Sequence, residues 1–355
     1  MALTIVPFAE AHLDAAAALF AARHRADRAR EPDFPDRLTD PAHARPLLEQ
    51  AWSQPMTTGV AALRDGRMTG YLFGSIVLPE PTSVMSLFVA PRATQISDAG
   101  YAAEPDDAAH IYRALYAAAA PAWLRAGCFA HYVTVRTCDP VAVDGWLSLG
   151  FGREMVSGVH DLAPPEHPSI PGGLAIVRAG TEDVEQVFQM FRDNLRYHAR
   201  SPMFDGYFKE TEQSLHADVE QLLTDPETSP VWLAQRGLRP VGVINLVPPR
   251  PRATTPDQAV HLQQGYTEPD ARGSGIATAL LAEAFAWARD AGFRRCTINW
   301  HTANLLGARF WQRAGFRPTT FSLVRRIDER ITWARPAGDA APPPARYSSR
   351  TRQAR

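Results

Sequence analysis

The sequence has little that would direct the chain out of the cytoplasm or support a disulfide or zinc framework. Its three cysteines, Cys128, Cys138 and Cys296, lie far apart and form no CxxC pair, which is typical of reduced thiols in the cytosol. The alanine-rich stretch 114–124 is interrupted by Pro121 and is too short to span a bilayer. The N-terminus carries acidic residues where a signal peptide needs a basic start. We therefore expect a soluble, cytoplasmic protein without membrane contact.

An excess of charge of either sign is also missing. The 355 residues include 37 Lys and Arg against 38 Asp and Glu, so the formal net charge is −1. Such a balance creates no bulk field that would attract nucleic acid. A chain of this length can bury a large core and usually folds as two domains. The composition thus predicts a two-domain globular protein without a nucleic-acid partner.

The chain shows the same order of motifs twice, which indicates a tandem duplication. Strand-like segments, a hairpin glycine, a proline-ended strand and a Gly-Phe pair after a tryptophan-bearing helix all recur. The matched positions are Leu3 with Leu174, Gly70 with Gly242, Pro91 with Pro269, and Gly150-Phe151 with Gly315-Phe316. We expect a first domain over 1–163, a linker over 164–173, a second domain over 174–333 and a disordered tail over 334–355.

Hydrophobic periodicity and turn chemistry predict the individual elements. The expected strands are 3–8, 59–63, 70–77, 83–89, 131–136, 174–177, 231–235, 241–246, 259–267, 296–300 and 320–327. The expected helices are 12–28, 45–52, 107–125, 141–149, 181–197, 276–291 and 304–314. Thr181 is expected as an N-cap. This order of elements indicates an α/β protein.

The most informative stretch is 262–281, LQQGYTEPDARGSGIATALL, which predicts a strand, a tight turn and an amphipathic helix. Pro269 ends the strand because it can donate no ladder hydrogen bond. Gly273 and Gly275 permit positive φ and let a ligand approach the backbone closely. The unpaired N–H groups of a helix N-terminus bind anions, above all phosphate. The turn is therefore a candidate phosphate site.

A second motif follows the turn at a fixed distance. The first pattern is T-x-P-x-x-R-G-x-G-I-A from Thr267, and the second is N-x-x-G-x-x-F-W-x-x-x-G-F from Asn304. Together they resemble the GNAT acetyltransferase superfamily, strongly over 174–327 and weakly over 3–160. The resemblance implies two tandem α+β domains, each with a mixed, mostly antiparallel sheet flanked by helices. Two copies with one degenerate half resemble the arrangement of mycothiol synthase-like acetyltransferases.

The resemblance implies acetyl-CoA as co-substrate, with no metal. Backbone N–H groups of the turn would bind the pyrophosphate, and the preceding strand would splay from its neighbour to pair with the pantetheine amides. Asn304 matches a cofactor-contacting asparagine and can also be a helix N-cap. The implied cofactor residues are Gly265, Tyr266, Thr267, Arg272, Gly273, Ser274, Gly275, Ile276, Ala277, Asn304 and Trp311.

The catalytic residues remain open at this point. The family often places a carboxylate base on the fourth strand, but that region holds His261, and a second histidine, His301, follows the next strand. Either could accept a proton near neutral pH. The family's usual tyrosine acid is replaced by Trp311, whose indole does not ionise usefully, so Tyr266 or water would protonate the thiolate. The implied reaction is acetyl transfer to a small-molecule or peptide amine.

The N-terminal copy lacks the matching residues. With Pro91 aligned to Pro269, Thr94 occupies the place of the arginine and the loop 94–105 replaces the glycine turn, while Asp139 replaces the asparagine. We expect this half to bind no acyl-CoA and to support the other half or shape an acceptor pocket. The loop 196–207, with Asp205, is a candidate receptor for a cationic amine.

Two functions of other classes remain alternatives: a non-catalytic acyl-CoA-binding or sensing protein, and a scaffold without ligand. The sequence does not decide whether two chains pair.

Overall fold

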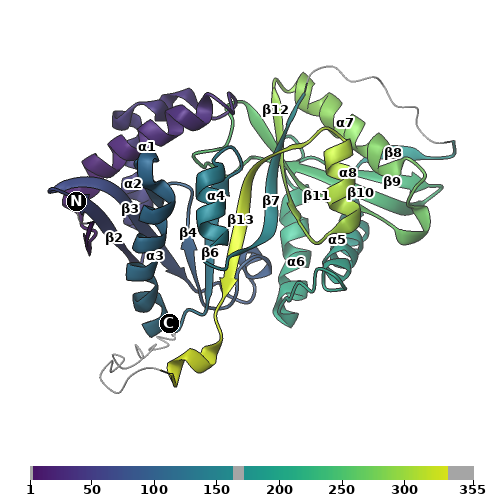
Figure 1. Cartoon of the computed structure of the whole chain (residues 1–355). Helices are drawn as coiled ribbons and strands as arrows, with labels where there is room; N and C mark the ends of the chain where they lie inside the picture. The colour runs from purple at the N-terminus through teal and green to yellow at the C-terminus, as the bar shows by residue number, and fades with distance from the viewer. Residues whose placement is uncertain (1–2, 163–171, 335–355) are drawn as a thin grey trace, which may run out of the picture.

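The computed structural model describes residues 3–162 and 172–334. The expected linker over 164–173 and tail over 334–355 lie outside these residues, except for Gly172, Gly173 and Ala334. The two halves stand side by side, the first in purple to blue and the second in green (Figure 1). No helix in the described ranges is both long and apolar enough to cross a bilayer.

The N-terminal half contains seven strands and four α-helices in its described residues. The strands are β1 (Thr4–Pro7), β2 (Thr57–Arg64), β3 (Arg67–Val77), β4 (Ala93–Ile96), β5 (Tyr101–Ala103), β6 (Ala130–Arg136) and β7 (Gly152–Asp161). The helices are α1 (Leu13–Arg28), α2 (Pro41–Trp52), α3 (Ala108–Arg125) and α4 (Pro140–Leu147). Asp65 and Gly66 join β2 to β3 with φ of 52° and 78°, as the predicted hairpin requires.

The described part of the C-terminal half follows the same order of elements. Its strands are β8 (Ala175–Arg178), β9 (Val231–Arg236), β10 (Arg239–Val247), β11 (Ala259–Thr267), β12 (Arg295–His301) and β13 (Arg317–Arg326). Its helices are α5 (Val184–His198), α6 (Lys209–Leu223), α7 (Ile276–Asp290) and α8 (Leu305–Arg313). The mixed α/β class and the tandem arrangement predicted from the sequence are confirmed.

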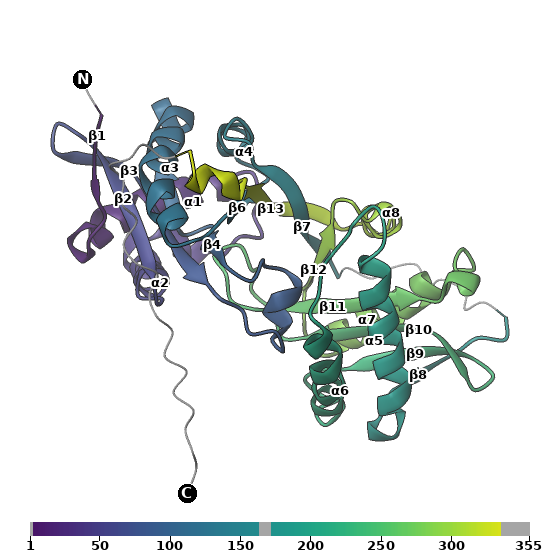
Figure 2. The same cartoon turned by 90° about the horizontal axis from the view of Figure 1, so that it is seen from below.

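All strands join one sheet, in the order β1-β2-β3-β4-β6-β13-β7-β12-β11-β10-β9-β8, with β5 beside β3. Seen from below, the sheet runs without a break from one half into the other (Figure 2). Only β4·β6 and β11·β12 run parallel among the described pairs. The last strands are exchanged: β13 lies against β6, and β7 lies against β12. Each half therefore completes the sheet of the other.

Helices cover both faces of this sheet. One face packs against α3 and α4 in the first half and against α7 and α8 in the second. The opposite face packs against α1 and α2 and, beyond them, against α5 and α6. Between these two helix pairs, the middle strands face a cavity of about 1140 Å³. The exchanged strands thus create a site that neither half has alone.

Three predictions about elements are wrong. The strand expected over 83–89 is a 3-10 turn, η3 (Val84–Leu87), capped by the Ser83 side chain, and the strand β4 comes after it. The helix expected from Thr181 begins at Val184, after the 3-10 turn Thr181–Asp183, and Gly180 N–H donates to Asp183 at 3.0 Å. Thr181 is therefore not the N-cap. The predicted elements also omit β5, β7 and α6.

Candidate active site

The glycine turn has the backbone expected of an anion site. Gly273 and Gly275 have φ of +76° and +84°, values that side-chain-bearing residues rarely adopt. A Cβ at Gly273 would meet nothing within 4 Å, so conformation and not crowding requires glycine there. The first hydrogen bond of α7 runs from Ala279 N–H to Gly275 O. The N–H groups of residues 276–278 therefore have no acceptor within the helix.

Arg272 fixes the turn to the end of β11. Its Nε–H donates to Thr267 O at 3.0 Å, and its guanidinium lies 4.7 Å from the Tyr197 ring centroid and 5.8 Å from that of Tyr266. Ser274 faces away from the cavity: its hydroxyl donates to Ala271 O at 2.6 Å. Of the predicted cofactor residues, Ser274 alone does not line the cavity.

The strand β11 parts from β12 next to the turn, as predicted. The two strands pair from Ala259 to Leu262 only, whereas β11 stays paired with β10 as far as Thr267. The register shifts at Gln263, an extra residue in β11 of the kind that bends a strand. Main-chain groups of residues 263–267 on the β12 side consequently face the cavity.

Trp311 packs directly on this opened strand. It is 9% exposed, and a Cβ on Gly265 would lie 3.0 Å from the indole Cη2. Gly265 is thus required by close approach. Asn304 caps α8, its Oδ1 accepting from Gly307 N–H at 2.8 Å, and the Tyr197 hydroxyl lies 3.5 Å from the same oxygen. Asn304 therefore has the N-cap role, with cavity contact besides.

His301 lies in a chain of polar side chains at the cavity wall. Its Nε2 lies 3.1 Å from Asp205 Oδ2, and His198 Nδ1 lies 3.4 Å from the same oxygen. Burial lowers the pKa of His301, and His198 lowers it further, while Asp205 opposes this shift. A buried imidazole oriented by a carboxylate can accept a proton from a bound substrate.

The same three side chains can also ligate metals, since their donor atoms lie within 4.8 Å of one another. The Asp205–His301 distance is that of a hydrogen bond, and we interpret the cluster as a proton-transfer chain. The expected lack of a metal stays a prediction. The sequence indicated Asp205 only as a candidate receptor for an amine, because its contact with His301 depends on the loop between α5 and α6.

His261 lies apart from this cluster. Its Nδ1 is 2.9 Å from Thr297 Oγ1. Thr297 lies four residues before His301 on β12, which places the two residues about 13 Å apart along the strand. Burial, and then Arg252 and Arg250, lower the pKa of His261 to about 4, which makes it a weak base. Tyr266 is 8% exposed, and burial raises its pKa to about 12. It therefore keeps its proton at neutral pH and can act only as a donor there.

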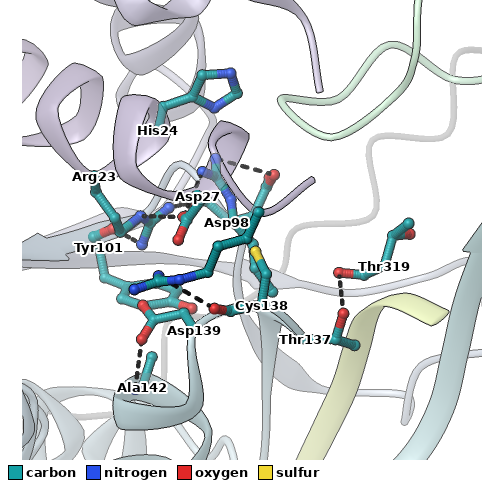
Figure 3. Close-up of polar contacts among 12 residues, drawn as sticks. Arg23, His24, Asp27, Asp98, Tyr101, Thr137, Cys138, Asp139, Ala142 and Thr319 are labelled. Carbon is teal, nitrogen blue, oxygen red and sulfur yellow. Dashed lines mark hydrogen bonds and ion pairs between the residues drawn. The ribbon is translucent and has the colours of Figure 1, made fainter. Parts of the chain in front are cut away.

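The N-terminal half carries a buried ion cluster at the corresponding place. Arg136 ends β6 as His301 ends β12, and Asp27 lies in the last turn of α1 as His198 ends α5. Arg136 Nη1–H donates to Asp27 Oδ2 at 2.9 Å, and the two side chains are 1% and 2% exposed. Arg23 Nε lies 3.9 Å from Asp27 Oδ2, and Asp98 Oδ2 lies 3.9 Å from Arg136 Nη2 (Figure 3). In the first half, buried ion pairs thus occupy the place that corresponds to the His198–Asp205–His301 cluster of the second half.

The glycine turn has no counterpart in the first half. Glu104-Pro105-Asp106 corresponds to Glu268-Pro269-Asp270, and α3 begins at Ala108 without an intervening turn. The earlier match of Pro91 with Pro269 is therefore wrong, and Thr94 lies within β4 instead of a phosphate turn. Asp139 does match Asn304, since its carboxylate caps α4 at Ala142 N–H.

We expect Asp27→Ala to destabilise the protein strongly. The substitution removes the close partner of the buried Arg136 guanidinium and leaves it only Asp98, whose Oδ2 is 3.9 Å from Nη2. Breaking a buried ion pair typically costs about 3–5 kcal/mol of unfolding free energy. Urea unfolding followed by tryptophan fluorescence measures the loss. Asp36→Ala is the control: Asp36 pairs with Arg28 at 3.0 Å but is 76% exposed, so little change is expected. Equal midpoints for both variants would contradict a structural role of the cluster.

Comparisons with known proteins agree with this geometry. A model described as the acetyltransferase (GNAT) family matches residues 188–316. A GCN5-related N-acetyltransferase from Sphaerobacter thermophilus aligns with 91% of this chain and 94% of its own, at 16% identity and a TM-score of 0.58. A GCN5-related glucosamine N-acetyltransferase region of a fungal multi-domain GH3 β-N-acetylglucosaminidase aligns with 91% of this chain and 38% of its own, at 13% identity and a TM-score of 0.56.

A tandem GNAT protein from the clavulanic acid biosynthesis pathway aligns with 91% of this chain and 97% of its own, at 15% identity and a TM-score of 0.49. A search among curated proteins found no match. At these identities the two structures with TM-scores above 0.5 show a shared fold and nothing about substrates.

Proposed function

This chain carries a GNAT-family acetyltransferase domain, and from that premise we propose that it transfers acetyl from acetyl-CoA to an amine in its C-terminal half. The observation that carries the proposal is the turn from Arg272 to Gly275, whose two positive-φ glycines open the N-terminus of α7 toward the cavity. Free N–H groups at a helix N-terminus bind phosphate oxygens. The turn would hold the pyrophosphate of coenzyme A.

The opened strand would hold the pantetheine arm. Main-chain groups of Gly265, Tyr266 and Thr267 face the gap between β11 and β12, where amides of the arm could pair with them. Trp311 covers Gly265 from one side. These contacts would lead the thioester toward His301, which lines the same cavity.

Acetyl-CoA supplies an activated acyl group, and the side chains of the protein would take the proton from the amine and return one to the thiolate. The lone pair of the neutral amine forms a bond to the acetyl carbon, the carbon–sulfur bond breaks, and its electron pair leaves on sulfur. His301, oriented by Asp205, takes the proton that the amine nitrogen loses. Tyr266 or water gives a proton to the thiolate, since Trp311 cannot.

The proposal also assigns a role to each half of the chain, a class of acceptor and a location. Residues 1–163 form a degenerate half that binds no acyl-CoA, and residues 174–333 form the acting half. The acceptor is a small molecule or a peptide, and the reaction takes place in the cytoplasm. The alternative of a non-catalytic acyl-CoA-binding protein rests on Trp311, which stands where the family has its acid.

Calorimetry and a turnover assay test the proposal together. We expect acetyl-CoA to bind one site per chain and a panel of primary amines to release coenzyme A, measured with a thiol reagent. The protein's own free cysteines require a blank without acetyl-CoA. Tight binding without turnover on any amine would support the binding protein instead, and no heat of binding would reject both.

A further inference from the structure

The sheet beneath the cavity has an uncovered polar face beside His301. Across the strands, His301 faces Met155, Met155 faces Ser322, and Ser322 faces Thr134. A second row runs from Asn299 to Ser157 and on to Thr320. Residues directly opposite one another point to the same side of a sheet, and all seven line the cavity. We call these two rows the polar floor.

Most polar groups of this floor have no protein partner. The side chains of Thr134, Ser157, Ser322 and Asn299 make no hydrogen bond with any described residue. None of them is buried, so each can bond to a ligand. The floor also carries no charge between His301 and Arg136, and Arg136 is closed off by Asp27. Its chemistry suits neutral hydroxyl groups better than carboxylates or phosphates.

An apolar surface from the N-terminal half lines the same cavity. Met85 and Phe88 lie in and next to η3 and line the cavity, and Phe88 is 44% exposed. The segment before them is held to α6, since Thr211 Oγ1 donates to Pro81 O and Ser214 Oγ to Thr82 O, both at 2.9 Å. A saturated ring with hydroxyl groups at its edge and C–H groups on its faces can use both surfaces.

We propose that the acceptor is a polyhydroxylated primary amine of the amino-sugar class, with its amino group at His301 and its hydroxyl groups on the polar floor. The inference rests on the proposed acetyl transfer. Three strand spacings separate His301 from Thr134, about 14 Å, which is longer than one sugar ring. The floor therefore favours an amino sugar that carries a further ring or polyol.

Matched acceptors test the inference. Glucosamine and a glucosamine-containing disaccharide are compared with cyclohexylamine, which has a six-membered ring and no hydroxyl groups. We expect kcat/KM, expressed per concentration of unprotonated amine because the acceptors differ in basicity, to be at least about 10-fold higher for the amino sugars, and higher for the disaccharide than for the monosaccharide. Ser157→Ala and Ser322→Ala should each lower kcat/KM for the amino sugars by about three- to tenfold, the usual worth of one neutral hydrogen bond. Neither should change kcat/KM for cyclohexylamine.

Ser148→Ala is the matched control, because Ser148 is exposed after α4 and does not line the cavity. Equal kcat/KM for glucosamine and cyclohexylamine, or equal losses on both in the floor variants, would overturn the inference while leaving acetyl transfer intact. If no amine is turned over, calorimetry in the presence of coenzyme A measures whether the disaccharide binds to the polar floor. Binding weakened by Ser157→Ala then supports the floor although the proposed transfer fails, and no binding rejects it.

Discussion

Replacing Gly273 by glutamate is expected to weaken acetyl-CoA binding by at least about 100-fold. Gly273 lines the cavity at the turn that leads into α7, and its φ of +76° requires glycine. A carboxylate there would face the pyrophosphate with like charge, and the strained backbone would shift the N–H groups that bind it. A 100-fold loss corresponds to about 2.7 kcal/mol of binding free energy, and calorimetry measures it directly.

Gly292→Glu separates this effect from backbone strain. Gly292 follows α7 with φ of +86°, and a Cβ there would meet nothing within 4 Å, as at Gly273. It does not line the cavity. Both variants therefore carry the same conformational cost, and only Gly273→Glu should lose acetyl-CoA. If the two variants bind acetyl-CoA equally, the turn is not the pyrophosphate site.

The turn could be predicted from sequence because its requirements are local. Positive φ demands glycine at residues 273 and 275, and a proline ends the strand before them. Trp311 could be assigned to the site for a similar reason, since it stands at a fixed distance after the capping residue Asn304. Local requirements of this kind can be recognised in a single sequence without knowledge of the fold.

Features that depend on distant partners could not be predicted in this way. The exchange of β7 and β13 is set by pairing between strands more than 150 residues apart, and no local pattern encodes it. The apolar run at 83–89 favours a strand by composition, yet Ser83 caps a 3-10 turn there, and the two residues before it, Pro81 and Thr82, accept hydrogen bonds from α6. The contact of Asp205 with His301 likewise arises only when α5 and β12 are folded together.

The duplication was recognisable, but its alignment was not. Pro91 and Pro105 both follow a short apolar segment, and sequence alone favours the wrong one. The register settles the choice: β4 and β5 both pair with β3, as β11 pairs with β10. The pair β4 and β5 is thus an interrupted β11, and Pro105 after β5 is the counterpart of Pro269, with no glycine turn following it.

Replacing His301 by glutamine is expected to lower kcat by about 10²–10³-fold, while the affinity for acetyl-CoA stays unchanged. General-base catalysis by a positioned side chain typically contributes about 10²–10⁴-fold. Glutamine retains a hydrogen-bonding group of similar length beside Asp205 but cannot take up a proton. Steady-state kinetics with saturating acetyl-CoA measures kcat, and calorimetry measures binding.

His216→Gln is the matched control. His216 also lies between carboxylates, with Nε2 at 3.7 Å from Glu185 and Nδ1 at 3.5 Å from Glu220, but it is on α6 outside the cavity. Its replacement should leave kcat unchanged. If His261→Gln carries the loss and His301→Gln does not, the assignment of the base is wrong. A loss of activity on adding a chelator would show that the cluster holds a metal instead.

The pH profile gives a second, independent test of the same histidine. A base works in its unprotonated form, so kcat at saturating amine should fall as pH drops through the His301 pKa, which burial holds below its usual value of 6.5. Asp205 raises that pKa, because a negative charge favours the imidazolium. Asp205→Asn removes this cause, so the acidic limb should move to lower pH while kcat falls. A limb that stays in place in Asp205→Asn, or persists in His301→Gln, would assign the titrating group elsewhere.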